Sequence, residues 1–439
     1  SVFGNQIVIL PTGAGKSLCF QLPAMMLNGN TLVIYPILSL MADQERRLTE
    51  KNFSPVILRG GQTKTEREDI FRKLKTGESS FIIANPEVLL TENMLKILPE
   101  LGIVHVVIDE AHCVSEWGLS FRPSYLEIAK IVSAAKAPIV TAFTATASEA
   151  VLEKIENYIF PGGGAHKIIG NPNRSNIAYS ACGTLLRDLS VAKLLKSNQK
   201  PAIVFCSSRC GTEKLSRYLR NTLSTNEIKF YHAGLSREEK TDVEKWFYSS
   251  KDGTLVATCA FGMGVDKADI RTVIHRDCPP TPEAYLQESG RAGRDGAFSR
   301  AFLLWGSDDE SAMRRAKTDY DKIRLKLLLE YARNTTKCRR EQLLEMLNYA
   351  DCEEKPETEC CDVCAKKTDG KMIEEQFFVN FFAKNKRAYT ESEAAKITAN
   401  IGNADMQEKD AKLAIRGLIK LKKLKKHSSF FWKDKISAP

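Results

Sequence analysis

The chain has 439 residues, of which 43% are hydrophobic and 27% charged. This length and composition predict a globular protein of two to four domains. No apolar run approaches the length of a membrane span and no signal peptide is visible, so we expect no membrane partner and an intracellular, unsecreted protein, cytoplasmic in a bacterium or nuclear in a eukaryote. The chain begins with Ser1 and a strand is expected from Gln6, so we also expect that an upstream segment is missing.

The charged and sulfur-bearing residues are unevenly distributed. The formal net charge is +10, and residues 371–439 carry 15 Lys and Arg against 8 Asp and Glu, which is +7. Such a basic segment suits a polyanionic partner. Five of the twelve cysteines lie between Cys338 and Cys364, while the others are scattered. In a large, unsecreted chain this pattern predicts a reducing compartment and one metal site.

The first predicted strand, Gln6–Leu10, is followed by the glycine-rich run Pro11–Ser17 and a helical pattern over Leu18–Leu27. Glycines let backbone N–H groups curl round phosphates at a helix start, Lys16 reaches the β- and γ-phosphates, and Ser17 offers a hydroxyl to Mg²⁺. Leu10 stands where the strict phosphate-loop pattern has its first glycine. An ordinary strand–turn–helix is therefore the alternative for this run taken alone.

Apolar strands then alternate with helical patterns, which predicts a parallel sheet with crossover helices. The expected strands are Thr31–Tyr35, Val56–Leu58, Phe81–Ala84, Val104–Ile108 and Ile139–Phe143, and Pro161–Gly164 punctuates the end of the unit. A second series of the same kind comprises Ala202–Cys206, Lys229–His232, Thr254–Thr258, Thr272–His275 and Arg300–Leu304.

Asp109, Glu110, Ala111 and His112 follow a buried strand, at the sheet edge where α/β proteins bind ligands. One carboxylate there can hold a nucleotide-bound Mg²⁺, and the other can orient water toward a γ-phosphate. The loop that follows contains Trp117, Phe121 and Arg122, whose flat side chains suit stacking on single-stranded nucleic acid. The plainer alternative is a strand end with solvated acids and two core aromatics.

In the second series, the run Gln287–Gly296 places Arg291 and Arg294 three residues apart among glycines, after a helical Pro282–Leu286. Arginine donors of this kind stabilise charge on a transferring phosphoryl group when they enter a neighbouring phosphate site. Taken alone, a solvated Arg/Gly turn accounts for the run equally well.

From its first strand to about Cys364, the chain resembles the RecQ family of superfamily-two DNA helicases. Besides the three motifs above, the matching runs are Ser39–Gln44, Thr144–Ala147, Tyr231–Leu235 and Ala260–Lys267. The resemblance implies two RecA-like α/β lobes and ATP-driven, 3′-to-5′ unwinding of duplex DNA in recombination, repair and replication. It implies catalytic roles for Lys16, Asp109, Glu110, Gln287, Arg291 and Arg294, and nucleotide or Mg²⁺ contacts from Thr12, Gly13, Ala14, Gly15, Lys16, Ser17, Asp109, Gly264 and Asp266.

The aromatic loop departs from the family's usual sequence at Glu116, Leu119 and Ser120, where Gln, His and Asp are typical. The family's upstream, adenine-reading motif has no counterpart in these residues. Trp117, Phe121 and Arg122 remain the implied nucleic-acid contacts, with single-stranded and duplex DNA as partners. A single-strand-binding protein and a topoisomerase are the candidate protein partners.

The segment from residue 307 to 370 has a helical pattern over Ser311–Tyr331 and then the cysteine cluster. Four thiolates complete a tetrahedral Zn²⁺ shell of the structural kind. The resemblance favours Cys338, Cys360, Cys361 and Cys364 as ligands, with Cys352 in reserve for Cys360. Buried free thiols are the alternative, but they do not account for five cysteines within 27 residues.

In the tail, residues 371–439, the residue pattern predicts helices over Ile373–Lys384, Glu391–Ala399 and Glu408–Leu421, and a hairpin over Lys425–Lys433. This order indicates a small winged-helix-like domain. The lysines of residues 421–426, beside Phe430–Trp432, suit a duplex contact, although a solvated helix end is the ordinary interpretation of a charge run. The expected domains are thus 1–170 and 171–306 for the two lobes, 307–370 for the zinc module and 371–439 for the tail.

Two other functions remain open from the sequence. An RNA helicase shares the acidic motif, but the cysteine cluster and the Trp117 loop favour DNA. A nucleic-acid-binding scaffold with little or no ATP hydrolysis is the other alternative. ATPase activity measured with and without single-stranded DNA separates both from a DNA helicase.

Overall fold

The computed structural model describes residues 4–11, 14–116, 123–145, 148–262, 267–306, 308–309, 313, 318–347, 349, 356, 359–368, 372–401 and 406–439. The chain forms two compact units. The first comprises Ser1–Asn173 with Met346–Ala350, and the second comprises Arg174–Glu345 with Asp351–Pro439. Among the helices of these described residues, none is long and apolar enough to cross a membrane.

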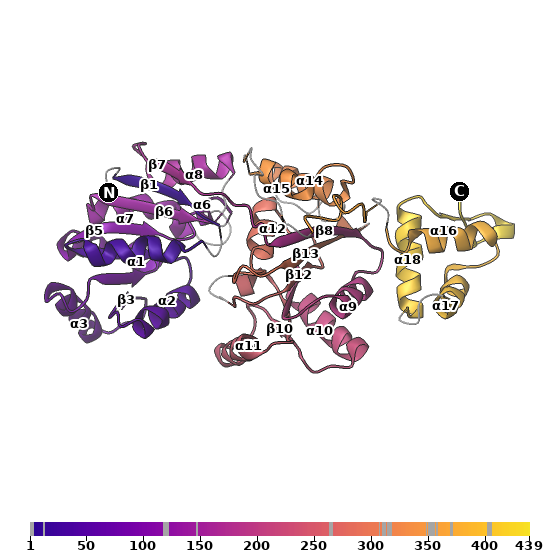
Figure 1. The fold of residues 1–439 in the computed structure, drawn as a ribbon, viewed down its shortest axis with the longest axis horizontal. Helices are drawn as coiled ribbons and strands as arrows, with labels where there is room; N and C mark the ends of the chain where they lie inside the picture. The colour runs from indigo at the N-terminus through magenta and orange to yellow at the C-terminus, as the bar shows by residue number, and fades with distance from the viewer. Residues whose placement is uncertain are drawn as a thin grey trace. The chain divides into compact units, whose positions relative to one another are not determined.

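The first unit is built on a seven-stranded parallel sheet in the order β3-β4-β2-β5-β6-β1-β7 (Figure 1). The strands are β1 (Asn5–Ile9), β2 (Asn30–Ile34), β3 (Val56–Leu58), β4 (Phe81–Ala84), β5 (Ile103–Ile108), β6 (Ile139–Thr144) and β7 (His166–Ile169). The helices are α1 (Lys16–Met26), α2 (Leu38–Glu50), α3 (Lys64–Lys75), α4 (Pro86–Leu89), α5 (Glu92–Ile97), η1 (Leu98–Leu101), α6 (Cys113–Glu116), η2 (Pro123–Glu127), α7 (Ile128–Ala135) and α8 (Glu149–Ile159).

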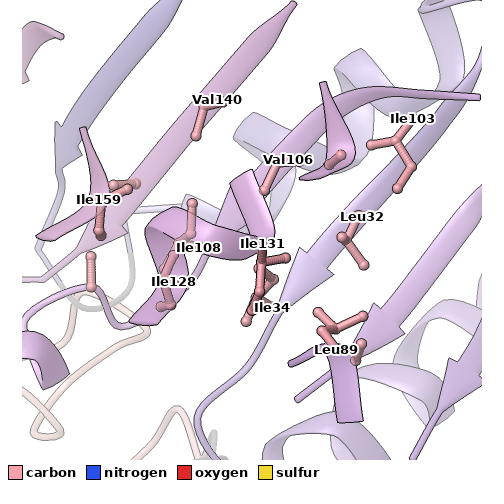
Figure 2. Close-up of a cluster of buried hydrophobic side chains, with 14 of the residues drawn as sticks. Leu32, Ile34, Leu89, Ile103, Val106, Ile108, Ile128, Ile131, Val140 and Ile159 are labelled. Atoms are coloured by element: carbon pink, nitrogen blue, oxygen red, sulfur yellow. The ribbon is translucent and has the colours of Figure 1, made fainter. Parts of the chain in front are cut away.

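The central strands of this sheet are buried along nearly their whole length, as expected when helices cover both faces of a parallel sheet. Figure 2 shows part of this core, with Leu32, Val106 and Val140 from three strands beside Ile128 and Ile131 of α7. These side chains are almost fully inaccessible to solvent. The packed core therefore holds the strand ends in fixed positions.

Strand order brings distant parts of the sequence together. β6 lies between β5 and β1, and all three are parallel, so their carboxyl ends lie at one edge of the sheet. The loops that leave this edge are the glycine-rich run after β1, the acidic run after β5 and the run that begins at Thr144 after β6. This edge is the usual ligand-binding position of open α/β sheets.

The second unit contains a six-stranded parallel sheet in the order β10-β11-β9-β12-β13-β8 (Figure 1). Its strands are β8 (Ile177–Gly183), β9 (Ala202–Phe205), β10 (Ile228–Tyr231), β11 (Thr254–Ala257), β12 (Thr272–His275) and β13 (Ser299–Trp305). Its helices up to the cysteine cluster are α9 (Arg187–Ser197), α10 (Arg209–Leu223), α11 (Arg237–Ser249), η3 (Cys259–Gly262), α12 (Pro282–Ser289), α14 (Asp319–Arg333) and α15 (Arg339–Glu345).

The cysteine-rich segment covers the outer edge of β8. Tyr179 forms a parallel bridge with Cys361, and Gly183 forms another with Met372. Between them, the backbone N–H of Ala181 donates to the Asp362 carboxylate at 3.1 Å. An uncovered edge strand would leave backbone groups unpaired, so this segment completes the sheet and is part of the same fold.

The tail forms three helices and a two-stranded antiparallel sheet, which are the elements of a winged helix. They are α16 (Glu375–Lys384), α17 (Glu391–Ile401), α18 (Glu408–Lys420), β14 (Lys425–Lys426), η4 (Phe430–Trp432) and β15 (Ile436–Ser437). Phe378, Phe382, Ile415 and Leu418 form its core, and Leu186 and Leu189 at the start of α9 pack into the same cluster. The tail is therefore packed against the sheet domain of its own unit.

The predicted fold class, two parallel-sheet lobes followed by a zinc-type cysteine cluster and a small helical tail, is confirmed. The predicted strands lie within one residue of the observed ones at each end, but β7 and β8 were missed. β7 is a short strand with all four residues exposed, and β8 mixes Ser, Tyr and Cys, so neither has a clear apolar signal.

β7 lies between Pro161–Gly164 and residue 170, the expected end of the first lobe, and it pairs with β1. One further detail of the prediction was wrong. The hairpin predicted over Lys425–Lys433 pairs Lys425–Lys426 with Ile436–Ser437 instead. The reason is burial: Ile436 belongs to the tail core, whereas Phe430–Trp432 form an exposed 3-10 turn between the two strands.

Candidate active site

The glycine-rich run after β1 forms the start of α1. Gly15 caps the helix in the left-handed region, with φ 82° and ψ 25°, a conformation that glycine adopts without strain. The first turn, from Lys16, contains no acidic side chain, and the N–H of Leu18 at its end donates to the carbonyl of Gly15 at 2.9 Å. The N–H groups of the residues before Leu18 precede the carbonyls of the helix and point out of its start. An exposed helix start of this kind is suited to phosphate. Ala14 is exposed and Ser17 half-buried, whereas the predicted contacts Thr12 and Gly13 lie outside the described residues.

The acidic run is held in place by both neighbours of β5. The N–H of Asp109 donates to the carbonyl of Ile34 at 3.0 Å, and the N–H of Ala111 donates to that of Phe143 at 2.8 Å. Between them Glu110 takes a left-handed backbone conformation, with φ 50°, and its N–H donates to the Asp109 carboxylate at 2.9 Å. The turn therefore holds two adjacent carboxylates at the sheet edge.

The two loops meet at Lys16 and Glu110. The Lys16 Nζ lies 3.9 Å from Oε1 of Glu110, and the two side chains are 15% and 14% exposed. The residues are far apart in the sequence, so the contact depends on the strand order that places β1 and β5 on either side of β6. A cation and a carboxylate thus lie together, half-buried at one edge of the sheet.

The surroundings of the Asp109 carboxyl group disfavour its charged form. Desolvation raises its pKa to about 6, and the nearby Glu110 carboxylate adds to the rise, while Lys16 and the Glu110 N–H oppose it. A desolvated carboxylate beside a second carboxylate is stabilised by a cation. With the Ser17 hydroxyl, it offers the hard oxygen atoms that Mg²⁺ prefers, so the residues present fit that ion.

His112 and Thr144 extend the acidic site toward β6. Nδ1 of His112 lies 3.4 Å from Oε2 of Glu110 and 3.0 Å from Oγ1 of Thr144. Thr144 is fully buried at the end of β6 and opens the predicted Thr144–Ala147 motif. His112 therefore links Glu110 to the next loop along the sheet edge, a contact that sequence reasoning did not anticipate.

The predicted nucleic-acid contacts Trp117, Phe121 and Arg122 lie outside the described residues, but both flanks of their loop are described. After the loop, the buried Tyr125 donates its hydroxyl to the backbone carbonyl of Asp109 at 3.2 Å. Ser124 donates to Glu87 at 2.8 Å. The loop's end is thus joined directly to the acidic turn by Tyr125, a residue that no sequence motif singles out.

A cavity of about 470 Å³ lies beside α1 but does not belong to this site. Its lining is mainly apolar, including Val8, Leu10, Pro23 and Phe143. None of Lys16, Asp109 or Glu110 lines it. The chemistry of the sheet edge therefore rests on the loops and not on this cavity.

In the second unit, the arginine run follows α12. Arg291 is buried, with 4% of its surface exposed, and Arg294 and Gln287 are half-buried. Gly293 has φ 53°, and a Cβ there would lie 2.5 Å from the carbonyl of Ala297, so only glycine fits. The run is a tightly held loop of this unit and not the freely solvated turn that was the alternative. Gly264 and Asp266 lie outside the described residues.

The cysteine cluster has the dimensions of a four-thiolate metal site. The Sγ atoms of Cys338, Cys360, Cys361 and Cys364 all lie within 4.8 Å of one another, with Cys338 to Cys360 at 3.6 Å and Cys361 to Cys338 at 4.0 Å. Tetrahedral zinc, with Zn–S bonds of about 2.3 Å, would require separations of about 3.8 Å. The reserve ligand Cys352 lies outside the described residues.

A thiolate is favoured at the centre of this cluster. Hydrogen bonding with the Cys338 and Cys360 thiols, with a bond from the Cys364 N–H at 3.3 Å, holds the pKa of Cys361 well below its usual range, while the pKa values of Cys360 and Cys364 are raised. Zn²⁺ binds cysteine as the thiolate. The geometry of the cluster therefore fits zinc.

The tail presents aromatic rings and lysines on one short stretch. Phe430 and Phe431 are 92% and 85% exposed, and the Arg387 guanidinium lies 5.5 Å from the centre of the Trp432 ring. Lys423 and Lys426 are paired with Glu375 and Asp434. The positive charge of this stretch is thus partly neutralised within the tail, whereas the Phe430 and Phe431 rings lie open to solvent.

Comparison with known families defines the class of protein. Residues 3–155 match the DEAD/DEAH box helicase family, and residues 184–296 match the helicase conserved C-terminal domain. The structure of helicase MrfA bound to DNA and AMPPNP is similar, with a TM-score of 0.57 and 19% identity over 78% of this chain and 52% of that one. These matches give the two sheets the architecture of a helicase motor.

Relatives define the family. The RecQ helicase of Pasteurella multocida is 33% identical over 378 residues, which cover 83% of this chain and 59% of the relative. The RecQ helicase of Bacillus subtilis is 30% identical over 451 residues, which cover 97% of this chain and 73% of the relative. The chain belongs to the RecQ family of ATP-dependent DNA helicases. It spans about three fifths of the length of the first of these relatives.

Proposed function

We propose that this chain is the motor and DNA-binding part of a RecQ-type helicase, which hydrolyses ATP to unwind duplex DNA in the 3′-to-5′ direction. One observation carries the proposal: the Lys16 Nζ and the Glu110 carboxylate lie 3.9 Å apart at the carboxyl edge of a parallel sheet. The names of the relatives, which are DNA helicases, support DNA as the substrate. Roles in recombination, repair and replication follow the same family expectation.

The first unit binds the nucleotide in this proposal. Backbone N–H groups of Thr12–Ser17 cradle the phosphates, and Lys16 contacts the β- and γ-phosphates. Ser17 and Asp109 hold Mg²⁺, which when bound neutralises charge on the phosphate oxygens. Glu110, held by the turn beside Lys16, accepts a hydrogen bond from the attacking water and orients it.

The second unit completes the catalytic site. Arg291 and Arg294 donate to the transferring phosphoryl group, with Arg294 as the principal finger because it is the less buried of the two. Gln287, Gly264 and Asp266 contact the nucleotide from the same unit. Closing and opening of the two lobes with each ATP then moves the chain along one strand.

DNA contacts are proposed at two places. Trp117, Phe121 and Arg122 stack on the single strand, and the tail grips the duplex through its lysines and the exposed Phe430 and Phe431. Zn²⁺ at the four cysteines holds the intervening module together. A single-strand-binding protein or a topoisomerase as partner stays a prediction.

The proposed function is tested by strand displacement on 3′-tailed, 5′-tailed and blunt duplexes, with DNA or RNA as the tailed strand. We expect ATP-dependent displacement of the 3′-tailed DNA substrate at least about tenfold faster than of the others, which is a difference of about 1.4 kcal/mol in barrier. Faster displacement with an RNA tailed strand would favour the alternative function of an RNA helicase. DNA binding without ATP turnover would favour the alternative function of a nucleic-acid-binding scaffold.

Coupling between DNA and ATP is tested at Trp117. Stacking on an aromatic ring contributes about 1–3 kcal/mol per base, enough to shift a loop equilibrium about tenfold. Tyr125 gives the loop a direct contact with the acidic turn. Trp117→Ala should therefore keep its basal ATPase rate but lose most stimulation by single-stranded DNA, and Tyr125→Phe should lose part of it.

The matched control is Tyr158→Ala, which removes an exposed aromatic ring from α8 of the same unit. ATPase rate is measured against DNA concentration for each variant. The coupling would have to pass through other residues if DNA stimulated the Trp117 variant fully and the DNA concentration that gives half of the maximal stimulation were unchanged.

A further inference from the structure

Two side chains at the start of the second unit hold the arginine run by its backbone. Arg174 donates from Nη1 to the carbonyl of Gly290 at 2.9 Å, and from Nη2 to those of Ala292 at 3.0 Å and Gly293 at 2.8 Å. Asn176 donates from Nδ2 to Gly293 at 2.7 Å and to Ala297 at 2.9 Å. These contacts join residues more than 110 positions apart in the sequence.

The carbonyls that accept these bonds bracket the two catalytic candidates. Gly290 and Ala292 flank Arg291, and Gly293 immediately precedes Arg294. The N–H of Gly293 also donates to the carbonyl of Ile270 at 2.8 Å. The peptide group between Ala292 and Gly293 is therefore held at its N–H by Ile270 and at its carbonyl by Arg174. Arg174 and Asn176 therefore fix the backbone from which the side chains of Arg291 and Arg294 project.

Arg174 is itself held by the cysteine module. Arg340 donates from Nη1 to the Arg174 carbonyl at 2.8 Å and from Nη2 to that of Ile177 at 2.5 Å. The Nε of Arg340 lies 3.4 Å from Sγ of Cys360, and its guanidinium stacks over Tyr179 of β8, 5.3 Å from the ring centre. A short, partly buried chain of contacts thus joins the cysteine cluster to the arginine run.

We propose that Arg174 is a positioning residue for ATP hydrolysis: it clamps the backbone of the arginine run, so that Arg291 and Arg294 are held in a catalytic orientation, and Arg340 anchors this clamp to the cysteine cluster. The inference rests on the proposed function, because it takes these arginines to stabilise the transferring phosphoryl group. A guanidinium fits this task because it donates to three carbonyls in one plane, whereas the compact ammonium of lysine cannot match that geometry.

The test compares Arg174→Gln with Arg174→Lys in the full chain, with saturating single-stranded DNA. A displacement of about 1 Å at a catalytic group costs about a hundredfold in rate. We expect kcat to fall about 10- to 100-fold in Arg174→Gln, and less in Arg174→Lys. Affinity for AMPPNP should stay within about twofold, while affinity for ADP–aluminium fluoride, a transition-state mimic, should fall in proportion to kcat.

Two further variants separate positioning from loss of folding. Asn176→Ala removes two bonds of the clamp without removing a charge and should show a smaller fall in kcat with the same pattern of analogue affinities. Arg300→Gln is the matched control, because this arginine pairs with Glu359 beside the cysteine cluster and lies over the Phe298 ring. Its kcat, zinc content and melting temperature should match the parent chain.

Arg294→Ala distinguishes this inference from the proposed function, and should itself lower kcat about a thousandfold or more. If Arg294→Ala turns ATP over normally, the proposed catalytic role of the arginine run is wrong. If it is inactive while Arg174→Gln is normal, or if Arg174→Gln weakens both analogues equally, the clamp is overturned. In the Arg294→Ala background, Arg174→Gln should slow turnover by less than it does in the parent chain, because the part of its effect that acts through Arg294 is already lost.

Discussion

Replacement of Glu110 by glutamine is expected to abolish ATP turnover while ATP binding persists. Glutamine keeps the size of the side chain but cannot accept the proton or orient water as a carboxylate does, and such a group contributes about 10²- to 10⁴-fold to rate. Lys16, Ser17 and Asp109 remain to hold phosphate and Mg²⁺. Because the variant also frees Lys16 from a carboxylate 3.9 Å away, the affinity for AMPPNP should be unchanged or higher.

Phosphate release and AMPPNP binding are measured side by side for this variant. The control is Glu92→Gln, which neutralises an exposed acid in the first turn of α5 in the same unit and should leave both quantities unchanged. Turnover of Glu110→Gln within a few-fold of the parent, on the order of 1 kcal/mol in barrier, would remove Glu110 from the mechanism.

Loss of the cysteine cluster is expected to unfold much of the second unit. We expect one Zn²⁺ per chain and, for Cys361→Ala, loss of zinc together with insolubility or protease sensitivity, because a structural zinc contributes its binding free energy to folding. Cys361 is almost fully buried and bridges to Tyr179 of β8. The adjacent Asp362 pairs with the buried Arg339 and accepts the N–H of Ala181, so the edge of the sheet depends on this segment.

Elemental analysis, limited proteolysis and thermal unfolding measure this effect. Cys210→Ala, which removes an exposed thiol from α10, is the matched control and should retain zinc and fold. Cys352→Ala should also retain zinc if the four clustered thiols are the ligands. Folded and active protein that contains no zinc would contradict the prediction.

Much of the site could be anticipated because its chemistry is local in sequence. A glycine-rich turn between a strand and a helix start presents N–H groups whatever surrounds it, and two acids after a buried strand must lie at a sheet edge. The cysteine cluster could be predicted in the same way, because thiols in that number and spacing are typical of a closed zinc site. The strands were found for the same reason: buried parallel strands are continuous apolar runs.

Other parts depended on partners that no local pattern reveals. Tyr125 belongs to no sequence motif, and only the fold shows that it contacts Asp109. His112 and Thr144 belong to motifs, but the sequence did not show that His112 contacts both Glu110 and Thr144. Ile436 lies beyond the predicted end of the hairpin at Lys433, and its burial in the tail core explains why the second strand lies there. β8 lacked a clear apolar signal because Tyr, Ser and Cys interrupt it, although most of the strand is buried.

The sequence by itself thus determined the class of fold and the positions of the glycine-rich run, the acidic turn, the arginine run and the cysteine cluster, because each of these four is a short stretch whose residue types dictate its chemistry. Only the tertiary structure decided how these stretches are held: that Lys16 meets Glu110, and that Arg174 reaches the carbonyls around Arg291. The physical reason is that the residues of a motif themselves supply its hydrogen-bonding groups. The groups that position it come from strand order and packing, which join residues more than ninety places apart.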